Sequence, residues 1–461
     1  MFNNLFPKSL IRSAVIIISC VLIVFLGTIF LDYSVPDTAA TEETVSADSS
    51  VADANYICDG TNNEGTCEPN TVRTATLVIA ASNSSAASKT QADYVCDGID
   101  DQIEINAAMN SLPANGGEVV LLEGTYYISG SITMAPSSWL TGQGPYNTTI
   151  QLADNANCHA IVAPTSNSWI RGIRDLRLEG NYPKQTGVWH GIYSKTSQVN
   201  DGDLRVLNCS IFHFSGDGIH LANGYYIHIK DSAIEYNVGN GIFLSSGMAV
   251  LDSLDLHDNY RNLRMEYNAQ TTIINSHLRT TVSDNIYAQQ YENLRIINNM
   301  IERSGDLGVS GFGIYLRGLS SGSNKKVIIL GNIFLGGPKE SYNVYINQSN
   351  EGILISDNNF SGYRIGAIYR HSSAKDVKIN NNHGYATENS GIAAIKNGAT
   401  KVVVKHGLAT VPTQISLTPT NGMGNATKFY VDSLTTTDFT INVDADPGEK
   451  TATFNWRAVA E

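Results

Sequence analysis

Between residues 203 and 349 the sequence alternates short apolar segments with turns rich in Asn and Gly, and this alternation repeats. Written in register, three of the repeats read LRVLNCSIFHFSGDGIHLANG, YIHIKDSAIEYNVGNGIFLSSG and MAVLDSLDLHDNYRNLRMEYNA. The period of about 21 to 30 residues is too short for a propeller blade, and the repeats lack the helical half of most leucine-rich or helix-pair repeats. Each repeat therefore predicts one coil with two short strands separated by Asn and Gly turns.

Alternation within the recurring segment GI-x-L predicts which side chains face the interior of the coil. It points Ile219 and Leu221 inward and His220 outward, because successive side chains of a strand lie on opposite faces. The same inward pairs recur as Ile242/Leu244, Leu263/Met265, Ile286/Ala288, Ile314/Leu316 and Val344/Ile346. No single coil can bury its own inner face, so stacking at about 4.8 Å per rung has to supply the core. The fold class expected is all-β, a right-handed parallel β-helix.

The pattern differs on either side of these repeats. Asp100 to Leu112 reads as a helix, with an acidic first turn, a terminating Pro113, and Ile103, Ala107 and Ala108 on one face. After Ala399, short alternating strands are separated by Pro and Gly. We therefore expect an N-terminal cap at residues 74–145, the β-helix at 146–399 and a small β-sandwich domain at 400–461.

The N-terminal segment predicts the compartment. Ser13 to Leu31 contains no charged residue and follows Lys8 and Arg12. As a helix it would span roughly 28 Å, close to the thickness of a bilayer core, with the basic flank inside. Residues 1–31 are therefore expected to form a cytoplasmic flank and transmembrane anchor. A lipoprotein box ending at Cys20 and a cleaved signal peptide remain alternatives. All three place the rest of the chain outside the cytoplasm.

Residues 32–73 are small, polar and acidic at their start, which is typical of a flexible stalk. Cys58 and Cys67 lie close together in the sequence and could form a disulfide in an oxidising compartment. The chain carries 43 acidic against 30 basic residues, a net charge of −13. This balance lacks the basic footprint of a nucleic-acid-binding protein, so nucleic acid is excluded as an expected partner.

Several motifs near the start of the repeats resemble one known superfamily. They are Asp97-Gly-Ile-Asp-Asp101, the helix ending in NAAMNSL, Gly116-Gly-Glu-Val-Val-Leu121, Glu123-Gly-Thr-Tyr126 and Ser138-Trp-Leu-Thr-Gly-Gln-Gly144. This block resembles the opening of pectate-lyase-like proteins, which include polygalacturonase-like enzymes and phage tailspikes. The resemblance implies a β-helix capped by a helix and a polysaccharide as partner, and it allows a homotrimer.

The C-terminal segments Val404-Lys-His-Gly-Leu408, Asp438-Phe-Thr-Ile-Asn442 and Phe454-Asn-Trp-Arg-Ala458 are similar to small β domains that end phage tail proteins. The sequence departs from the superfamily in its chemistry. The Asn-Thr-Asp, Gly-His-Gly and Arg-Ile-Lys set of polygalacturonases is absent, as are the Arg-rich motif of pectate lyases and the Asp-Pro-His-Asp motif of alginate epimerases. The resemblance therefore implies a fold without naming a reaction.

Two neighbouring columns of turn residues predict a polar ladder. One is Asn208, Asp231, Asp252, Asn275, Asn298, Gly331, Asp357 and Asn381. Beside it run Cys209, Ser232, Ser253, Ser276, Asn299, Asn332, Asn358 and Asn382. Asn tolerates the left-handed backbone conformation, and side-chain amides can bond from rung to rung. This makes Cys209 a turn residue rather than a nucleophile.

A second set of columns faces outward and predicts a sugar-binding surface. The column beside the glycines is Tyr193, His220, Phe243, Arg264, Tyr287, Tyr315 and Tyr345, and two residues further on it is accompanied by Glu266, Gln289 and Arg317. Aromatic faces next to amide and charged groups suit sugar rings. The candidate substrate-binding residues are Tyr193, His220, Phe243, Glu266, Tyr287, Tyr315, Arg317 and Tyr345. Alternatively, Tyr and Phe simply favour strands and stack on one another, and Arg264 pairs with Glu266.

Charged columns supply the catalytic candidates. One runs Phe212, Glu235, His257, Arg279 and Glu302 with Asp258 alongside, and another runs His190, Asp217, Asn240, Arg261 and Asp284. Glycoside hydrolysis needs two carboxyls about 5 to 9.5 Å apart, which Glu235 and Asp258 on adjacent rungs could meet. A lyase needs a base and neutralisation of charge by Arg or Ca²⁺. The catalytic candidates are Glu235, Asp258, Arg264 and Arg279, and the alternative is a solvated ladder of alternating charge.

These patterns favour a cell-surface β-helix protein that acts on polysaccharide as a glycan hydrolase or lyase. The competing hypothesis is a non-catalytic glycan-binding adhesin or a structural surface protein. No protein-held metal site is expected from the sequence. Ca²⁺ enters as a cofactor only if the chemistry is that of a lyase.

Overall fold

A computed structural model describes residues 75–163, 170–194, 203–222, 226–245, 247–267, 270–280, 282–302, 311–319, 324–337 and 340–460, together with strands β1 (Tyr56–Ile57) and β2 (Glu68–Pro69). The chain divides into two compact units, residues 1–71 and 72–461. The expected membrane anchor, most of the expected stalk, and the Cys58–Cys67 disulfide lie outside the described residues. Within the described part, no helix is long and apolar enough to cross a membrane.

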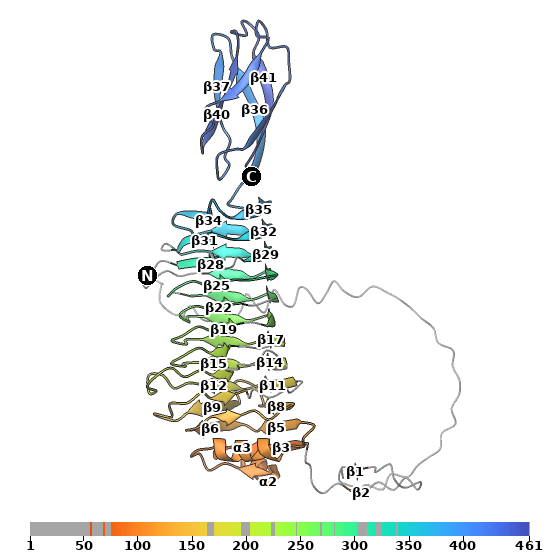
Figure 1. The fold of residues 1–461 in the computed structure, drawn as a ribbon, viewed down its shortest axis with the longest axis vertical. Coiled ribbons are helices and arrows are strands. Elements are labelled where there is room, and N and C mark those ends of the chain that lie inside the picture. Colours follow the sequence, from red (N-terminus) through yellow and green to blue (C-terminus); the bar gives the residue numbers. More distant parts are fainter. Residues whose placement is uncertain are drawn as a thin grey trace, which may run out of the picture. The chain divides into compact units, whose positions relative to one another are not determined.

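Three parallel sheets, here called sheets I, II and III, build the main body (Figure 1). In the described residues sheet I contains β3 (Thr76–Ala80), β4 (Tyr94–Val95), β5 (Gly117–Leu121), β8 (Ser138–Thr141), β11 (Ile170–Arg174), β14 (Asp203–Leu207), β17 (Tyr226–Lys230), β20 (Met248–Asp252), β23 (Gln270–Ile274), β26 (Leu294–Ile297), β29 (Lys325–Leu330), β32 (Glu351–Ser356) and β35 (Lys375–Asn380).

Sheet II contains β6 (Gly124–Ile128), β9 (Thr148–Leu152), β12 (Arg177–Glu179), β15 (Ser210–Phe212), β18 (Ala233–Glu235), β21 (Asp255–His257), β24 (His277–Arg279), β27 (Met300–Glu302), β30 (Ile333–Leu335) and β33 (Asn359–Ser361). Sheet III contains β7 (Ile132–Thr133), β10 (Ile161–Val162), β13 (Ile192–Ser194), β16 (Ile219–Leu221), β19 (Ile242–Ser245), β22 (Leu263–Glu266), β25 (Ile286–Gln289), β28 (Gly311–Arg317), β31 (Glu340–Ile346) and β34 (Gly366–Arg370).

Each coil places one strand in every sheet. The chain passes from β14 through β15 and β16 and returns to sheet I as β17, which pairs in parallel with β14. The parallel β-helix expected from the repeats is therefore confirmed. The sequence predicted two strands per repeat and the structure has three. Because only Asn208 and Cys209 separate β14 from β15, the two strands read as one apolar segment in the sequence.

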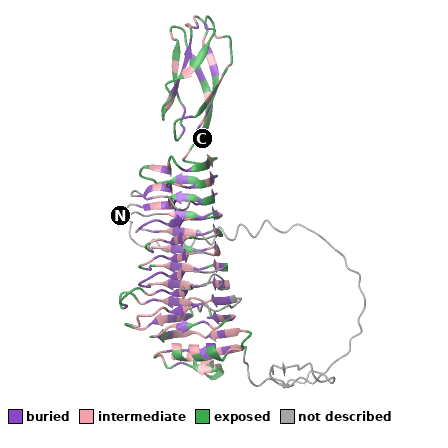
Figure 2. Cartoon of the chain, in the orientation of Figure 1, coloured by how far each residue is buried: buried purple, intermediate pink, exposed green. Residues whose placement is uncertain are grey.

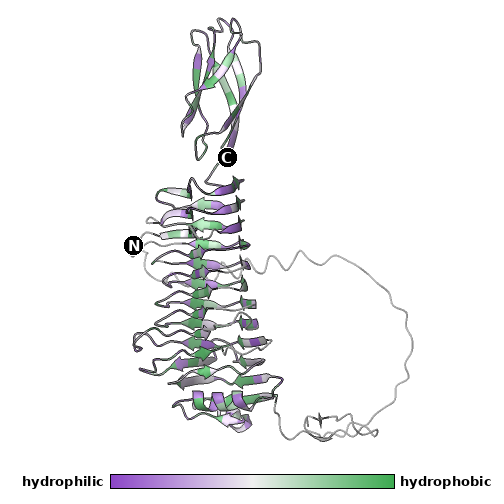
Figure 3. Ribbon diagram, viewed as in Figure 1, coloured by the Kyte–Doolittle hydropathy of each residue, from purple (hydrophilic) through white to green (hydrophobic). Residues whose placement is uncertain are grey.

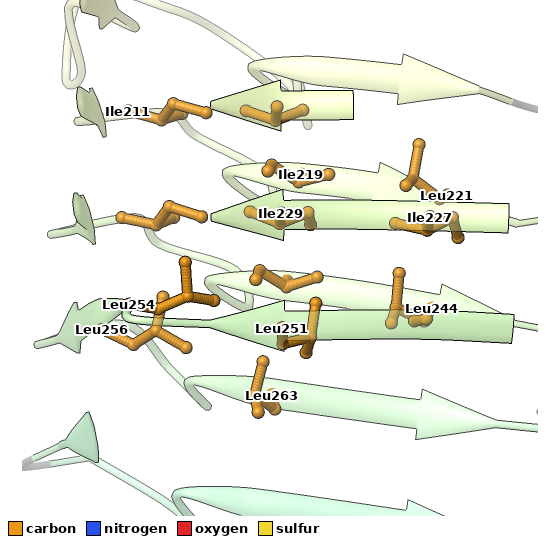
Figure 4. Packing of buried hydrophobic residues seen from close by; sticks show 14 of the residues in the cluster. Ile211, Ile219, Leu221, Ile227, Ile229, Leu244, Leu251, Leu254, Leu256 and Leu263 are labelled. Atoms are coloured by element: carbon orange, nitrogen blue, oxygen red, sulfur yellow. The ribbon is translucent and has the colours of Figure 1, made fainter. Parts of the chain in front are cut away.

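The interior is a continuous column of aliphatic side chains. All the inward pairs expected from GI-x-L are at most 2% exposed and belong to one cluster that extends from Leu77 to Val377. Figure 4 shows such side chains stacked from coil to coil, and Figures 2 and 3 show the buried, hydrophobic stripe running along the sheets. Each fully buried Ile or Leu contributes roughly 1.5 to 3 kcal/mol relative to an exposed one.

The polar ladder between sheets I and II is made of backbone-to-side-chain hydrogen bonds. The backbone N–H groups of Asn299, Asn332 and Asn358 each donate to the side-chain oxygen of the Asn one rung further, at 2.9, 2.9 and 3.0 Å. One rung corrects the sequence register, because Leu254 rather than Ser253 occupies the ladder position and donates to Ser276 Oγ at 3.1 Å. Asp252-Ser253 repeats the dipeptide Asp231-Ser232 but lies one residue earlier in its coil, so composition alone misaligned it.

Two short helices precede most of the coils, α2 (Ala86–Gln91) and α3 (Gln102–Ser111). The predicted helix over Asp100–Leu112 is confirmed by α3. Its buried face was predicted correctly at Ala108 and wrongly at Ile103 and Ala107, because Ile105, Ala108 and Met109 are buried, whereas Ile103 is 61% exposed and Ala107 is also exposed. The helix begins at Gln102, after Asp100 and Asp101, and it packs Ile105, Ala108 and Met109 into the core of the first coils.

The C-terminal module consists of two antiparallel sheets. One contains β36 (Glu388–Ile395), β41 (Ala452–Val459) and β38 (Gln414–Pro419), and the other contains β37 (Lys401–Lys405), β40 (Asp438–Val443) and β39 (Phe429–Asp432). Their inner faces share one hydrophobic cluster, as in a small sandwich. The module starts earlier than residue 400, because β36 pairs with β41. In the sequence, Gly391-Ile392-Ala393-Ala394-Ile395 reads like another coil strand.

Candidate functional site

The outward column of sheet III has the register that the sequence predicts. Tyr193 pairs with His220, His220 with Phe243, and Phe243 with Arg264. The column then continues through Tyr287, Tyr315 and Tyr345. It extends one rung beyond the prediction, to Tyr369.

At one end of this column, aromatic rings of successive rungs stack into a cluster. The ring of His159 lies 3.9 Å from that of Tyr193 and 5.1 Å from that of His190, in both cases nearly parallel. His190 is 4.4 Å from His220, whose ring is 4.6 Å from Phe243. We call His159, His190, Tyr193, Asp217 and His220 the histidine cluster.

Asp217 organises the histidine cluster. Its Oδ2 atom accepts a hydrogen bond from His220 Nδ1 at 2.7 Å, and its Oδ1 atom accepts two from Asn240, the backbone N–H at 2.6 Å and Nδ2 at 2.8 Å. Burial of Asp217 opposes its ionisation, but the bonds from His220 and Asn240 outweigh burial and lower its pKa. An ionised Asp217 fixes the proton of His220 on Nδ1, which leaves the Nε2 lone pair as the acceptor.

The other two histidines use Nδ1 as an acceptor. His190 Nδ1 accepts from the backbone N–H of Asp217 at 2.8 Å, and His159 Nδ1 accepts from that of His190 at 3.1 Å. Burial lowers the pKa of both imidazoles to about 4. Both rings are therefore neutral near pH 7.

Further along sheet III a second aromatic group is formed by Phe312, Tyr315, Tyr342, Tyr345 and Tyr369, here called the tyrosine platform. Tyr345 is central, at 4.4 Å from Tyr369, 4.5 Å from Phe312 and 5.5 Å from Tyr315. All five rings are partly exposed. Burial raises the pKa of Tyr315 and of Tyr345, so both keep their hydroxyl protons.

Between the two groups the column is less accessible. Tyr287 is only 6% exposed, and its hydroxyl donates to Gln289 at 2.8 Å and accepts from Arg317 at 2.8 Å. Arg264 pairs with Glu266 at 2.8 Å and lies 5.4 Å over the ring of Phe243. The alternative that Arg264 and Glu266 pair with each other is thus what the structure shows. Arg264 lies on sheet III, whereas Glu235 and Asp258 belong to sheet II.

The other catalytic candidates form an ion network on sheet II. Glu235 Oε2 lies 2.5 Å from His257 Nε2, His257 Nδ1 lies 3.2 Å from Asp258 Oδ2, and Arg279 Nη2 lies 3.0 Å from the same Asp258 oxygen. The hydrogen bond to Glu235 is the main cause that raises the pKa of His257. Glu235, Asp258 and Arg279 are therefore brought together, but the His257 ring lies between Glu235 and Asp258 and bonds to both.

A second such group lies one rung further on sheet II. His277 lies 3.5 Å from Asp255 and 3.3 Å from Glu302, and the hydrogen bond to Asp255 is the main cause that raises its pKa. Alternating charges of this kind match the ladder alternative. The catalytic role of Glu235, Asp258, Arg264 and Arg279 stays a prediction.

Sequence reasoning did not select His159, His190 or Asp217. A usable signal was present, because His190 and Asp217 each stand three residues before a member of the outward column, Tyr193 and His220. A turn between those positions brings them onto one surface. The histidine cluster combines residues of two columns, and neither column alone indicates it.

Two further features carry less chemistry. Cys209 is buried and burial raises its pKa to about 12, which agrees with a turn residue and not a nucleophile. An open hollow of about 410 Å³ is lined by Asp100, Tyr127, Asp154 and Asn181 near the start of sheet II. It contains no histidine and is lined by residues other than those of the histidine cluster.

Comparisons with known proteins agree on the fold. Residues 190–349 match the family model of the right handed beta helix region. A protein of Geobacillus virus E2, ORF18, superposes with a TM-score of 0.51 at 13% identity over 74% of this chain and 72% of its own. The right-handed β-helix expected from the sequence is confirmed by the family model and by this superposition.

Two other solved structures are similar at a lower level. The A-module of a mannuronan C-5 epimerase from Azotobacter vinelandii has a TM-score of 0.42 at 17% identity, covering 61% of this chain and 96% of that one. The enzymatically active domain of bacteriophage CBA120 tailspike protein 2 has a TM-score of 0.46 at 12% identity, covering 71% and 60%. Among curated proteins, none matches the sequence significantly.

Proposed function

We propose that this protein binds a polysaccharide along sheet III and cleaves it by β-elimination, with His220 as the base. The observation that carries the proposal is the short hydrogen bond from His220 Nδ1 to the buried carboxylate of Asp217, within a stack of aromatic rings. This arrangement holds an imidazole in the tautomer that accepts a proton at its outer nitrogen.

Binding is assigned to the two aromatic groups of sheet III. Sugar rings offer C–H patches to aromatic faces and hydroxyls to phenol, amide and charged groups. From His220 to Tyr345 the column climbs five rungs, which is about 24 Å at the usual strand spacing. A glycan chain that contacts both groups would lie along the axis of the coils.

In the proposed reaction, His220 Nε2 takes the proton from the ring carbon next to the carboxylate of a uronate residue. The electron pair of that C–H bond forms a carbon–carbon double bond, and the glycosidic C–O bond breaks with its electrons remaining on oxygen. The departing oxygen takes a proton from Tyr193 or from solvent. Asp217 stabilises the imidazolium that His220 becomes, a role that costs little reorganisation because the two are already bonded.

Elimination fits this cluster better than hydrolysis does. The two-carboxyl mechanism of glycosidases needs a second carboxyl about 5 to 9.5 Å away. Among the described residues, Asp217 is the one carboxylate bonded into the histidine cluster. Arg264 lies two rungs from His220 in the same column, and a uronate carboxylate would have to compete with Glu266 for its guanidinium group.

A non-catalytic glycan-binding protein is the second candidate. The tyrosine platform favours it, because stacked phenol rings can hold sugars without any reaction. We also propose that either activity takes place outside the cytoplasm, on the strength of the apolar segment Ser13–Leu31 and its basic flank. Membrane anchoring and assembly as a homotrimer stay predictions.

A panel of acidic and neutral polysaccharides, including alginate and polygalacturonate, tests the proposal with the full-length protein. We expect an unsaturated uronate product, detected by its ultraviolet absorbance, and new reducing ends from at least one acidic member. Reducing ends without unsaturation would refute elimination and favour hydrolysis. If one or more glycans bind and none of them yields product, the protein is a non-catalytic glycan-binding protein.

A further inference from the structure

Two imidazoles and one carboxylate of the histidine cluster lie close enough to share a metal ion. One ligand atom each from His190, Asp217 and His220 lies within 4.8 Å of the others. Asp217 Oδ2 is 3.7 Å from His190 Nδ1 and 2.7 Å from His220 Nδ1. Tetrahedral zinc with bonds of 2.0 to 2.1 Å separates its ligands by about 3.3 Å, so the Asp217–His220 pair would have to open by about 0.6 Å and the Asp217–His190 pair to close by about 0.4 Å. An ion on His190 Nδ1 would also replace the backbone N–H of Asp217, which donates to this nitrogen at 2.8 Å.

The surroundings of Asp217 resemble the outer shell of a metal site. Asn240 binds Asp217 Oδ1 through its backbone N–H and its Nδ2 atom, which leaves Oδ2 directed to the two histidines. Among the described residues, Asn240 Oδ1 is one of the buried oxygens without a hydrogen-bond partner, although the residue is only 7% exposed. A buried amide oxygen without a partner is costly, and a water molecule would satisfy it whether or not that water is bound to a cation.

Access to the cluster comes from one side. The side chains of His190 and Asp217 are 10% and 9% exposed, whereas that of His220 is 24% exposed. A small hydrated cation can therefore approach past His220 while the other two ligands stay in place.

Other groups on the described surface fit such an ion less well. The ion networks of sheet II each bring one histidine to their carboxylates, His257 in one and His277 in the other. Cys96, Asp101 and Glu104 also lie close together, but burial strongly raises the pKa of the Cys96 thiol, and a thiolate is what zinc binds. Two imidazoles and one carboxylate are the better donor set for such an ion.

We propose that His190, Asp217 and His220 bind a zinc-like divalent cation and that the bound ion switches off the base. The second half rests on the proposed function, and the first half does not. Binding at His220 Nδ1 displaces the proton that this nitrogen donates to Asp217. The neutral imidazole then carries its proton on Nε2, where the lone pair for substrate would have been. The lone pair of His220 Nδ1 then binds the metal, and Nε2 carries the proton and can no longer accept one from substrate.

Zinc binding is measured by isothermal titration calorimetry on full-length protein without a histidine tag, after treatment with chelator. Cobalt(II) added to the same protein should give the visible absorption of a tetrahedral site, a readout independent of any activity. We expect one ion per chain and a loss of affinity of tenfold or more in His190→Ala and His220→Ala. His190→Gln keeps a hydrogen-bond acceptor for Asp217 and serves if His190→Ala folds poorly.

His277→Ala, on sheet II, is the matched control and should bind zinc as the parent protein does. Absence of binding, or binding that His277→Ala abolishes and His190→Gln leaves intact, would overturn the site. If elimination activity is found, saturating zinc should inhibit it and chelator should restore it. Full activity with zinc bound would refute the switch while leaving the site. Zinc binding by a protein that cleaves none of the glycans would refute the proposed function instead.

Discussion

Sheets II and III both carry histidines and carboxylates on their outer faces, but the pKa values of the histidines shift in opposite directions. On sheet II, His257 and His277 each lie between two carboxylates, and hydrogen bonds to those carboxylates raise the pKa of both. In the turns that lead into sheet III, His159 and His190 stack against other rings, and burial lowers their pKa to about 4. Sheet II therefore favours imidazolium ions that pair with carboxylates, and sheet III favours neutral imidazoles.

The difference shows why spacing of charged residues alone does not identify an active site. Glu235 and Asp258 lie on adjacent rungs, as two catalytic carboxyls require, but His257 joins them into a chain of opposite charges. His220 has one carboxylate partner, at Nδ1, and its ring lies in an aromatic stack. A base needs a lone pair without a partner, and among the described residues none is bonded to His220 Nε2.

The largest expected effect separates the two faces by activity. His220→Ala should lower kcat about 100- to 10,000-fold, the usual contribution of a general base. His277→Ala, on sheet II, should change kcat less than threefold. Initial rates of unsaturated product formation measure both. A Glu235→Gln variant that loses activity as completely as His220→Ala would move the site to sheet II.

Stability should also separate the faces, by a smaller amount. Asp217→Ala leaves the buried donors of Asn240 and His220 without their acceptor and should cost about 2 to 3 kcal/mol. Glu235→Ala removes one partially exposed ion pair and should cost less than about 1 kcal/mol. Shifts in the midpoint of urea unfolding report the two losses. Equal shifts would mean that the Asp217 network is no more important to the fold than a surface pair.

Binding should extend along sheet III and be absent from sheet II. Tyr345→Ala removes the central ring of the tyrosine platform and should weaken binding of long chains about fivefold, which corresponds to roughly 1 kcal/mol, without changing kcat. Tyr127→Ala, an exposed ring on sheet II, is the control. Affinity electrophoresis in gels that contain the polysaccharide compares the two. Equal mobility of Tyr345→Ala and the parent protein would remove the platform from the binding surface.

The smallest expected effect is a dependence of stability on pH. His257 and His277 have folded-state pKa values above their ordinary value of about 6.5, so their stabilisation is fully present below that pH and is lost as the pH rises through the raised pKa. Because the His277 side chain is 40% exposed, the two together should contribute at most about 1 kcal/mol. The variant carrying both His257→Gln and His277→Gln should show a smaller fall in unfolding midpoint between pH 6 and pH 9. If the fall in unfolding midpoint is the same as in the parent protein, the pH dependence of stability does not come from His257 and His277.

The sequence predicted the periodic parts of the fold well. Glycine or asparagine before an alternating apolar pair, as in Gly218-Ile219 and Asn262-Leu263, marks the strands of sheet III, so the column from Tyr193 to Tyr345 was obtained with the correct register. Ladder positions were less secure, because Asp252-Ser253 and Asp231-Ser232 have the same composition at different registers. Strand β36 was assigned to the coils because its apolar alternation does not reveal its antiparallel partner.

The histidine cluster was harder to predict, and the reason is physical. His190, Asp217 and His220 come from two coils, and their contacts cross both a turn and a rung. Side-chain direction at a turn depends on backbone angles that a repeat pattern does not specify. The spacing of charged residues predicts which of them share a column on a strand. It does not predict whether those residues form ion pairs with one another.

A crystal structure of the His220→Ala variant, soaked with the longest oligosaccharide that it binds, tests the central claim most directly. We predict a sugar ring over Tyr193 at the histidine cluster, with the chain running along sheet III toward Tyr345. A chain bound across Glu235 and Asp258 on sheet II, or in the hollow lined by Asp100 and Asn181, would contradict it.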